Sequence, residues 1–499
     1  MESAVLVGID VGTSSTKAAV LSPEGAPLAI AAQAYAVDTP RPGWAEQDPD
    51  GWVEAVLTTT RRALDEAGVA PDAVRGVGLS GQMHGTVCVG EGGDPLRPAI
   101  IWADQRSEAQ VAAVISELGR QRLAAWTGNP LATGFMLPTW LWLREHEPEV
   151  AARTRWLMLP KDYVRYWLTG EVGAEPSDAA STSLFDPAAR RWSTPLLEAL
   201  AIDDGRLPPV HPSAAVAGGL REEPAAAMGL APGTPVIFGG SDQAMQALGN
   251  GVIDPGTLSS TIGTGGQLFA PTSTHVIDAP ELRLQSYCHV VPDRWHVETA
   301  MLAAGLSLRW LRDSVLGGGT YQALADAAAA VSPGADGLFF QPYLAGERTP
   351  HMDPRARGSF VGLTRRHGRA HLVRAVMEGV VLGMRQGLDL MVALGVPVER
   401  VVASGGATAH PLWLRLQADI YGRTIVRTKT VEAAATGAAM LAGVGVGTYA
   451  DAAEAIDRVV RWHPEMVEPD PVAVRIYARR YRLFCELYPR LVDTMHALG

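Results

Sequence analysis

Short apolar runs separated by turn residues open the chain and predict a group of adjacent β-strands. The runs cover residues 4–10, 16–21 and 28–36, and glycine, proline or acidic residues interrupt them. Residues 52–67 show helical spacing of apolar positions, with Asp50 as the expected N-cap. A further apolar strand is expected over residues 74–79. Three strands, a helix and another strand form the order found in one half of a ribonuclease-H-like or actin-like domain.

The second half of the chain repeats parts of this pattern. Residues 235–240 and 257–262 read as apolar strands, and each is followed by small or polar residues. A long helix is expected over residues 371–394, and a strand over 400–403 follows it. The repetition suggests a duplicated architecture. We therefore expect an α/β fold with two ribonuclease-H-like (actin-like ATPase) domains and an interdomain cleft.

The length of 499 residues exceeds what one hydrophobic core supports, which favours division into domains. We expect an N-terminal domain over residues 1–245. A nucleotide-binding domain is expected over residues 246–461. Residues 462–499 are expected to be helical and to pack back across the molecule.

Composition narrows the class of protein. A formal net charge of −11 argues against broad binding to nucleic acid or to an anionic membrane surface. The three cysteines, Cys88, Cys288 and Cys485, are far apart and predict neither a disulfide framework nor a zinc site. No signal peptide and no membrane-spanning run is evident, so a cytoplasmic location is expected. The sequence leaves a homodimer open.

Three glycine-rich turns could hold phosphate groups, because they expose backbone N–H groups without a Cβ in the way. Taken singly, such turns are mostly structural, but three of them together favour a nucleotide held between lobes. The residues are Gly12, Thr13 and Ser14; Thr264, Gly265 and Gly266; and Gly405, Gly406 and Ala407. The first turn lacks the second glycine of a P-loop and leads into a strand, so we reject that reading.

Two carboxylates stand directly at the ends of apolar strands. Asp242 could take a proton from a sugar hydroxyl during phosphoryl transfer, although an aspartate here could equally cap the helix that follows. Asp10 could hold Mg²⁺ near phosphate, or it could be a turn residue bonded to its own backbone.

Several polar residues after other strands are candidates for sugar binding. Gln82, Met83 and His84 follow the strand over 74–79, and a histidine at this place could alternatively be structural. Asp104 lies near an aromatic residue, a pairing common in sugar recognition, but an ion pair with Arg106 is the simpler alternative.

The chain resembles the FGGY family of carbohydrate kinases over nearly its whole length. The motifs that carry the resemblance are Gly8–Ser14, Trp44–Pro49, Gly81–Gly85, Leu159–Tyr163, Leu344–Pro350, Gly358–Leu363 and Ala375–Glu378. Of these, Gly81–Gly85 and Leu344–Pro350 favour the xylulokinase branch.

The resemblance implies ATP and Mg²⁺ as cofactors and D-xylulose as the acceptor. It implies Asp242 as the catalytic base and Asp10 as the carboxylate near Mg²⁺ and phosphate. Met83 and His84 would contact the sugar. Thr264, Gly265, Gly405 and Gly406 would contact the nucleotide.

Two positions depart from the family pattern. Thr139 stands where a lysine is usual, and Gln243 stands where xylulokinases often have asparagine. Gln243 is expected to contact the acceptor. Its presence leaves open that the acceptor is another ketose or a polyol, such as ribulose, ribitol or glycerol. Alternatives of another class are a nucleotide-dependent interaction module and a sugar-binding regulator without catalysis.

Overall fold

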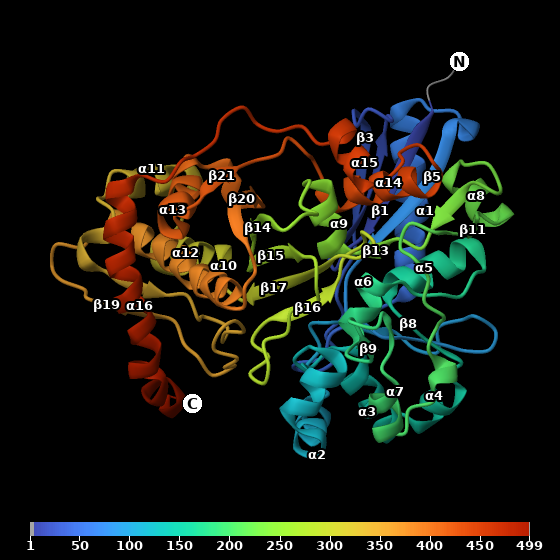
Figure 1. Ribbon diagram of the computed structural model, residues 1–499, viewed down its shortest axis with the longest axis horizontal. Helices are drawn as coiled ribbons and strands as arrows, with labels where there is room; N and C mark the ends of the chain where they lie inside the picture. The colour runs from blue at the N-terminus through green and yellow to red at the C-terminus, as the bar shows by residue number, and fades with distance from the viewer. Residues whose placement is uncertain (1–3, 499) are drawn as a thin grey trace.

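The computed structural model describes residues 4–498, which form two lobes that are each built on a central β-sheet (Figure 1). The first sheet has the strand order β11-β12-β5-β1-β2-β3. Its strands are β1 (Val5–Val11), β2 (Ser15–Leu21), β3 (Pro27–Ala34), β5 (Val74–Gly81), β11 (Val216–Gly219) and β12 (Pro235–Ile237), and β13 (Gly240–Ser241) extends the sheet beside the end of β5. Strands β1 to β3 are antiparallel neighbours, whereas β5 and β12 run parallel to β1.

The second sheet repeats this topology. Its order is β16-β17-β15-β14-β20-β21. The strands are β14 (Gly256–Ile262), β15 (Gly266–Thr272), β16 (Gln285–Cys288), β17 (Trp295–Met301), β20 (Val398–Ser404) and β21 (Thr424–Val426). Strands β14, β15 and β17 are antiparallel, and β20 and β21 run parallel to β14. Five strands of each sheet share the same order and directions, and only the additional edge strands differ, β11 beside β12 and β16 beside β17. This shared core confirms the expected fold class of two ribonuclease-H-like domains.

Alternation along β1 explains how the first sheet is covered on both faces. Val5, Val7, Ile9 and Val11 pack in one core with residues of helix α1 (Pro49–Ala67). Leu6 points to the other face, where it joins the core formed by α14 (Ala433–Gly445). This is the period of two that a strand buried on both faces shows.

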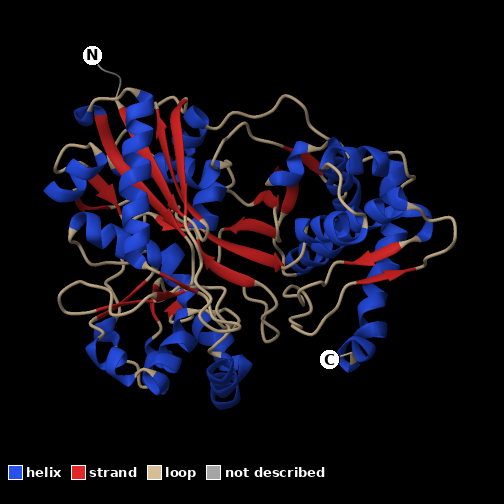
Figure 2. Ribbon diagram, turned by 180° about the vertical axis from the view of Figure 1, so that it is seen from behind, coloured by secondary structure: helices blue, strands red, loops and turns tan. Residues whose placement is uncertain are grey.

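Helices also surround the second sheet and fill the lower part of the first lobe (Figure 2). Those of the second lobe are α10 (Gly305–Trp310), α11 (Tyr321–Ala329), α12 (Arg369–Ala393), α13 (Pro411–Tyr421) and α16 (Pro471–Ala497). The first lobe also contains α2 (Glu108–Thr127), α3 (Met136–His146), α4 (Pro148–Arg153), α5 (Pro160–Thr169), α6 (Pro176–Ala179), α7 (Thr194–Ala199), α8 (Glu222–Met228), α9 (Asp242–Gly249) and α15 (Ala452–Val459). Short strand pairs complete the chain: β4 (Glu46–Gln47) with β7 (Ala99–Ile100), β6 (Val87–Val89) with β8 (Trp156–Met158), β9 (Phe185–Asp186) with β10 (Arg191–Trp192), and β18 (Phe339–Gln341) with β19 (Ser359–Val361).

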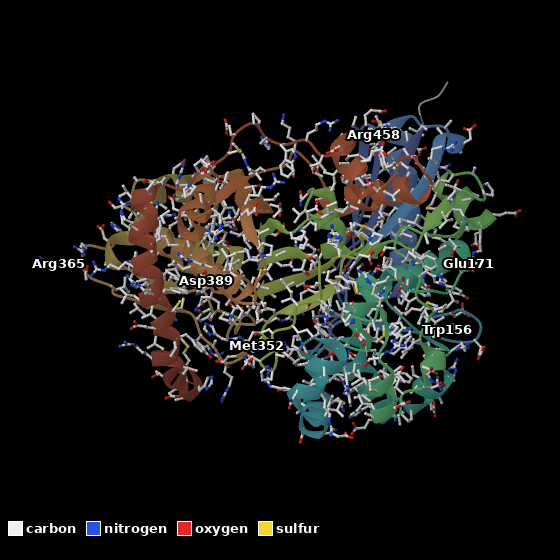
Figure 3. The ribbon with its side chains drawn as sticks, in the orientation of Figure 1. Trp156, Glu171, Met352, Arg365, Asp389 and Arg458 are labelled. Atoms are coloured by element: carbon white, nitrogen blue, oxygen red, sulfur yellow. The ribbon has the colours of Figure 1, made fainter. Side chains whose placement is uncertain are left out.

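The path of the last hundred residues differs from our expectation. Helix α16 does not pack back across the molecule but lies on α12 and α13 of the second lobe. The segment that returns to the first lobe is α14, which packs on β1, β5 and α9, followed by α15. Figure 3 shows Arg458 of α15 at the first lobe and Asp389 of α12 at the second. The expected boundary between residues 245 and 246 falls inside α9.

Two local expectations also change. Asp48, not Asp50, caps α1, because its side chain accepts a hydrogen bond from the backbone N–H of Asp50. The strand expected over residues 235–240 is two short strands, since Gly239 between them has a φ of 85°. Within residues 4–498, no helix combines the length and apolar character that a membrane span requires.

Candidate functional site

The two carboxylates singled out in the sequence meet at one edge of the first sheet. Strands β1, β5 and β13 are parallel neighbours, so their carboxyl ends lie together. Asp10 lies opposite Ser80 near the ends of β1 and β5, and the Ser80 hydroxyl donates to Asp10 Oδ1 at 2.7 Å. Ser241, which precedes Asp242, pairs with Gly81 one position further along β5.

Asp242 is an unusually basic carboxylate. Burial, and in smaller part the charge of Asp10, raise the pKa of Asp242 to about 8. Burial also raises the pKa of Asp10, against the opposing effects of Ser80 and Lys17. The Oδ1 atom of Asp242 is buried and has no hydrogen-bond partner among residues 4–498. Since Ser241 occupies the N-cap position of α9, Asp242 is not the helix cap that the alternative reading required.

A cavity of about 580 Å³ brings residues of both lobes together around Asp242. From the first lobe it is lined by the turn after β1 and the segment after β5, and from the second lobe by the turn between β14 and β15. The sequence-predicted residues that line it are Thr13, Ser14, Met83, His84, Asp242, Gln243, Thr264, Gly265 and Gly266. Gly12 lies beside them and forms the turn, with its N–H donating to the Ser15 carbonyl.

His84 presents a defined hydrogen-bonding edge to this cavity. Its ring stacks on Phe135 with centroids 3.8 Å apart, and its Nδ1 lies 2.7 Å from the Ser181 carbonyl. Burial lowers the pKa of His84 to about 3, so the ring is neutral at physiological pH. Because a carbonyl oxygen only accepts, Nδ1 carries the proton and Nε2 is left as an acceptor. A neutral histidine of this tautomer can accept a hydrogen bond from a sugar hydroxyl.

A second cavity of about 360 Å³ adjoins the first within the second lobe, because Gly263 and Thr264 line both. Gly406 and Ala407 line this second cavity, together with apolar side chains and Trp413. Gly405 lies directly before them, where a φ of 81° and the Ile262 carbonyl, 2.6 Å from the position of a Cβ, admit only glycine. The adjoining cavities therefore share one glycine turn.

Two of the predicted sugar-binding residues do not line the cavity. The Gln82 amide donates to Gln47 Oε1 at 2.9 Å and accepts from the Thr13 hydroxyl at 3.3 Å. Asp104 is buried, and its carboxylate accepts from the backbone N–H of Ala45 and from the guanidinium of Arg106. This interaction is a buried ion pair rather than a surface one.

The structure also reveals cavity residues that the sequence did not single out. Trp102, two residues before Asp104, lines the cavity, and its indole N–H donates to the Thr13 hydroxyl at 2.8 Å. Glu298 of β17 and Arg348 line it too. Arg348 lies in the motif Leu344–Pro350, and this was the signal by which the sequence could have indicated it. Glu298 follows His296 and Val297 in a strand with no turn signal, so nothing local marked it.

Within the described residues the structure offers no metal site made only of protein side chains. Among residues 4–498 there is no group of three or more His, Cys, Asp or Glu side chains suited to hold an ion. Asp10 accepts one hydrogen bond, on Oδ1, and influences a second buried carboxylate, Asp242. This pair of nearby negative charges is compatible with a cation shared between Asp10 and a phosphate.

The duplicated topology defines an actin-like ATPase fold, with two adjoining cavities near the junction of the lobes. The family model for the N-terminal domain of the FGGY family of carbohydrate kinases matches residues 5–249, and that for the C-terminal domain matches residues 258–446. The chain therefore belongs to the FGGY family of carbohydrate kinases.

Individual relatives cover almost the whole chain. The xylulose kinase of Escherichia coli is 35% identical over 98% of this chain and 99% of its own length. A crystal structure of xylulose kinase from Rhodospirillum rubrum superposes with a TM-score of 0.91 at 30% identity, covering 99% of this chain and all of that one. A gluconokinase of Bacillus subtilis is 31% identical over 87% of this chain and 86% of its own.

Proposed function

We propose that the protein transfers the γ-phosphate of ATP to a hydroxyl group of D-xylulose, giving D-xylulose 5-phosphate and ADP. The observation that carries the proposal is the basic carboxylate of Asp242, whose buried Oδ1 has no partner, on the wall of a cavity that adjoins a glycine-lined one. Relatives named xylulose kinase, which match nearly the whole chain, support the choice of acceptor.

In this proposal the first cavity holds the sugar and the second holds the nucleotide. Met83 offers an apolar surface to the sugar, while His84 Nε2 and the Gln243 amide bind its hydroxyl groups. The backbone N–H groups of Thr264, Gly265 and Gly266, and of the turn around Gly405, Gly406 and Ala407, face the phosphates. Gly12, Thr13 and Ser14 approach them from the first lobe.

Asp242 accepts the proton of the attacking hydroxyl as the bond to phosphorus forms. A base with a pKa near the working pH is well suited to this task, because it is deprotonated often enough and still attracts the proton strongly. Asp10 would hold Mg²⁺, which when bound neutralises charge on the phosphate oxygens. Enclosure between the lobes limits transfer of the phosphate to water.

The test replaces Asp242 by asparagine, which keeps the size of the side chain and removes the base. We expect kcat to fall about 100- to 10,000-fold, while the dissociation constant for the sugar changes little. ADP release is measured with D-xylulose, ribulose, ribitol, glycerol and D-gluconate for the wild type and the variant. Retention of full activity by a folded Asp242→Asn protein would refute the base assignment, and preference for another acceptor would refute D-xylulose.

A further inference from the structure

Two charged residues face the sugar cavity without a role in the mechanism above. Glu298 comes from the middle of β17, and Arg348 comes from the loop between β18 and β19. They line the same cavity as Asp242, but no ion pair within 4.0 Å joins them. Each therefore has hydrogen-bonding capacity that the other does not use.

Glu298 is an acceptor with one free oxygen. Its side chain is 3% exposed, and Oε2 accepts a hydrogen bond from the Gln267 amide at 3.1 Å. His296 lies 3.7 Å from the same oxygen and is neutral, because burial lowers its pKa well below the usual value. Within residues 4–498 no hydrogen bond reaches Oε1, and this oxygen is not one of the fully enclosed atoms without a partner, so it is open to the cavity that Glu298 lines. This arrangement indicates that a ligand supplies the missing donor.

Arg348 is a hydrogen-bond donor whose side chain has no acceptor, just as Glu298 has an oxygen without a donor. Its backbone N–H donates to Glu347 Oε1, but its guanidinium makes no hydrogen bond with any residue that the structure describes. A guanidinium carries five N–H donors in a fixed plane. A donor and an acceptor that face one cavity match the hydroxyl groups of a polyol, since each hydroxyl both donates and accepts.

We infer that Glu298 and Arg348 bind the acceptor through hydroxyl groups away from the phosphorylated one, and that Glu298 restricts the acceptor to uncharged sugars. The inference rests on the proposed function, because it places the acceptor in this cavity. A sugar acid would bring its carboxylate near both Asp242 and Glu298, with only Arg348 among the lining side chains to offset them. Burial and Asp242 raise the pKa of Glu298 to about 8, and Asp242 has a similar pKa, so both carboxylates are ionised above this pH. There the repulsion between like charges is strong, because the site holds little water, and it rejects a sugar acid.

The experiment compares kcat/KM for D-xylulose with kcat/KM for D-gluconate at pH 9, above the pKa of about 8 of Glu298. In Glu298→Gln the shape and the contact with Gln267 are kept, and only the charge is lost. We expect kcat/KM for D-xylulose to fall about 10-fold and the ratio of the two values to shift toward D-gluconate by about 10-fold or more. In Arg348→Gln the cation is lost instead, so the ratio shifts in the opposite direction, toward D-xylulose. Glu399→Gln removes an exposed carboxylate far from the cavity lining and leaves the ratio unchanged.

Opposite shifts in the two variants support the inference, because a loss of packing alone would lower both activities together. Ratios within about 2-fold of the wild type in both variants, with a wild type active on D-xylulose, overturn the inference and leave the proposed function standing. A wild type that phosphorylates none of the acceptors overturns both. Circular dichroism checks folding. If Glu298→Gln does not fold, the direction in which Arg348→Gln changes the ratio of the two kcat/KM values decides whether the inference stands.

Discussion

At the scale of single residues, the site gathers carboxylates that are poorly solvated. Burial is the largest cause of the raised pKa of Asp10, Asp242 and Glu298, and Asp242 contributes to that of Glu298. Each carboxylate makes the next one harder to ionise. A folded protein with such a group is less stable at a pH where the group must be charged.

Asp242 should therefore make stability depend on pH. Its pKa is about 8 in the folded protein against 3.8 for the ordinary group, so the folded state binds more protons between these values. Its favourable contribution is complete below pH 4 and is lost as the pH rises toward 8. We expect Asp242→Asn to be more stable than the wild type at pH 8.5 by about 1–3 kcal/mol. This is less than the full pKa difference would give, because water reaches the side chain through the cavity.

The measurement is thermal or urea unfolding of both proteins without ligands, from pH 5 to pH 8.5. The advantage of the variant should grow with pH. Asp72→Asn, which removes the same charge from an exposed turn, serves as the control. A constant difference between Asp242→Asn and the wild type across this range would show that the carboxylate is not perturbed by burial.

At the scale of elements, a buried network behind the cavity positions the site residues. Glu175, before α6, accepts hydrogen bonds from the hydroxyls of Ser177 and Ser213. The Ser177 oxygen accepts in turn from the backbone N–H of Ser241, next to Asp242. One short segment after α5 therefore fixes the start of α9, and through Ser181 it also fixes His84.

Lys161 of α5 supplies the positive charge of this network. Its ammonium group is fully buried and lies 2.7 Å from Asp162, 3.6 Å from Asp178 and 3.8 Å from Glu175. Replacement by methionine keeps the length of the side chain but leaves the buried carboxylates without this cation. We expect Lys161→Met to lose about 3–5 kcal/mol of stability in urea unfolding, with lower kcat because Ser241 and Asp242 are less well held.

The control is Lys429→Met at an exposed position, with an expected change within about 0.5 kcal/mol. Adding Asp162→Asn to Lys161→Met should restore part of the stability, because Asp162 is the carboxylate nearest to the lost ammonium group, at 2.7 Å. An unfolding curve of Lys161→Met that coincides with that of the wild type would mean that the network contributes nothing to the fold.

At the scale of the whole molecule, the return of α14 ties the second half of the chain to the first sheet. A Cβ on Gly78 of β5 would lie 2.0 Å from the Ala438 carbonyl of α14, so helix and sheet approach as closely as glycine permits. Lys17 of β2 pairs with Glu432 at the start of the same helix at 2.5 Å. The edge that holds Asp10 therefore depends on residues more than 400 positions away.

Gly78→Ala should disturb this contact. The added methyl group meets backbone that cannot move aside, and we expect a loss of about 1–3 kcal/mol or more in thermal unfolding, together with lower activity. Gly51→Ala, inside α1, is the matched control and should be neutral or slightly stabilising, because the nearest atom to the new Cβ is 3.9 Å away and alanine favours a helix. Equal stability of the two variants would contradict the close packing of α14 on β5.

Local pattern predicted most of the regular elements. Alternating apolar residues give β1, β2 and β5 within a few residues, and helical spacing gives α1 and α12. The polar groups of the site were predicted less evenly: Met83, His84 and Asp242 do line the cavity, while Gln82 and Asp104 do not. A side chain at a strand end faces either the cavity or a neighbouring polar group. The partner of Gln82 is Gln47, which is distant in sequence, whereas the pairing of Asp104 with Arg106 was the alternative that the sequence had offered.

The sequence by itself determined the strands, the glycine turns that follow them and the carboxylates at their ends, because these depend on residue type and on short-range spacing. Only the tertiary structure decided that α14 rather than α16 returns to the first lobe. It also decided that Trp102, and not Asp104, lines the cavity, and that Glu298 lines the same cavity as Asp242. Those outcomes depend on contacts between strands and helices that are far apart in the chain, which no local pattern encodes.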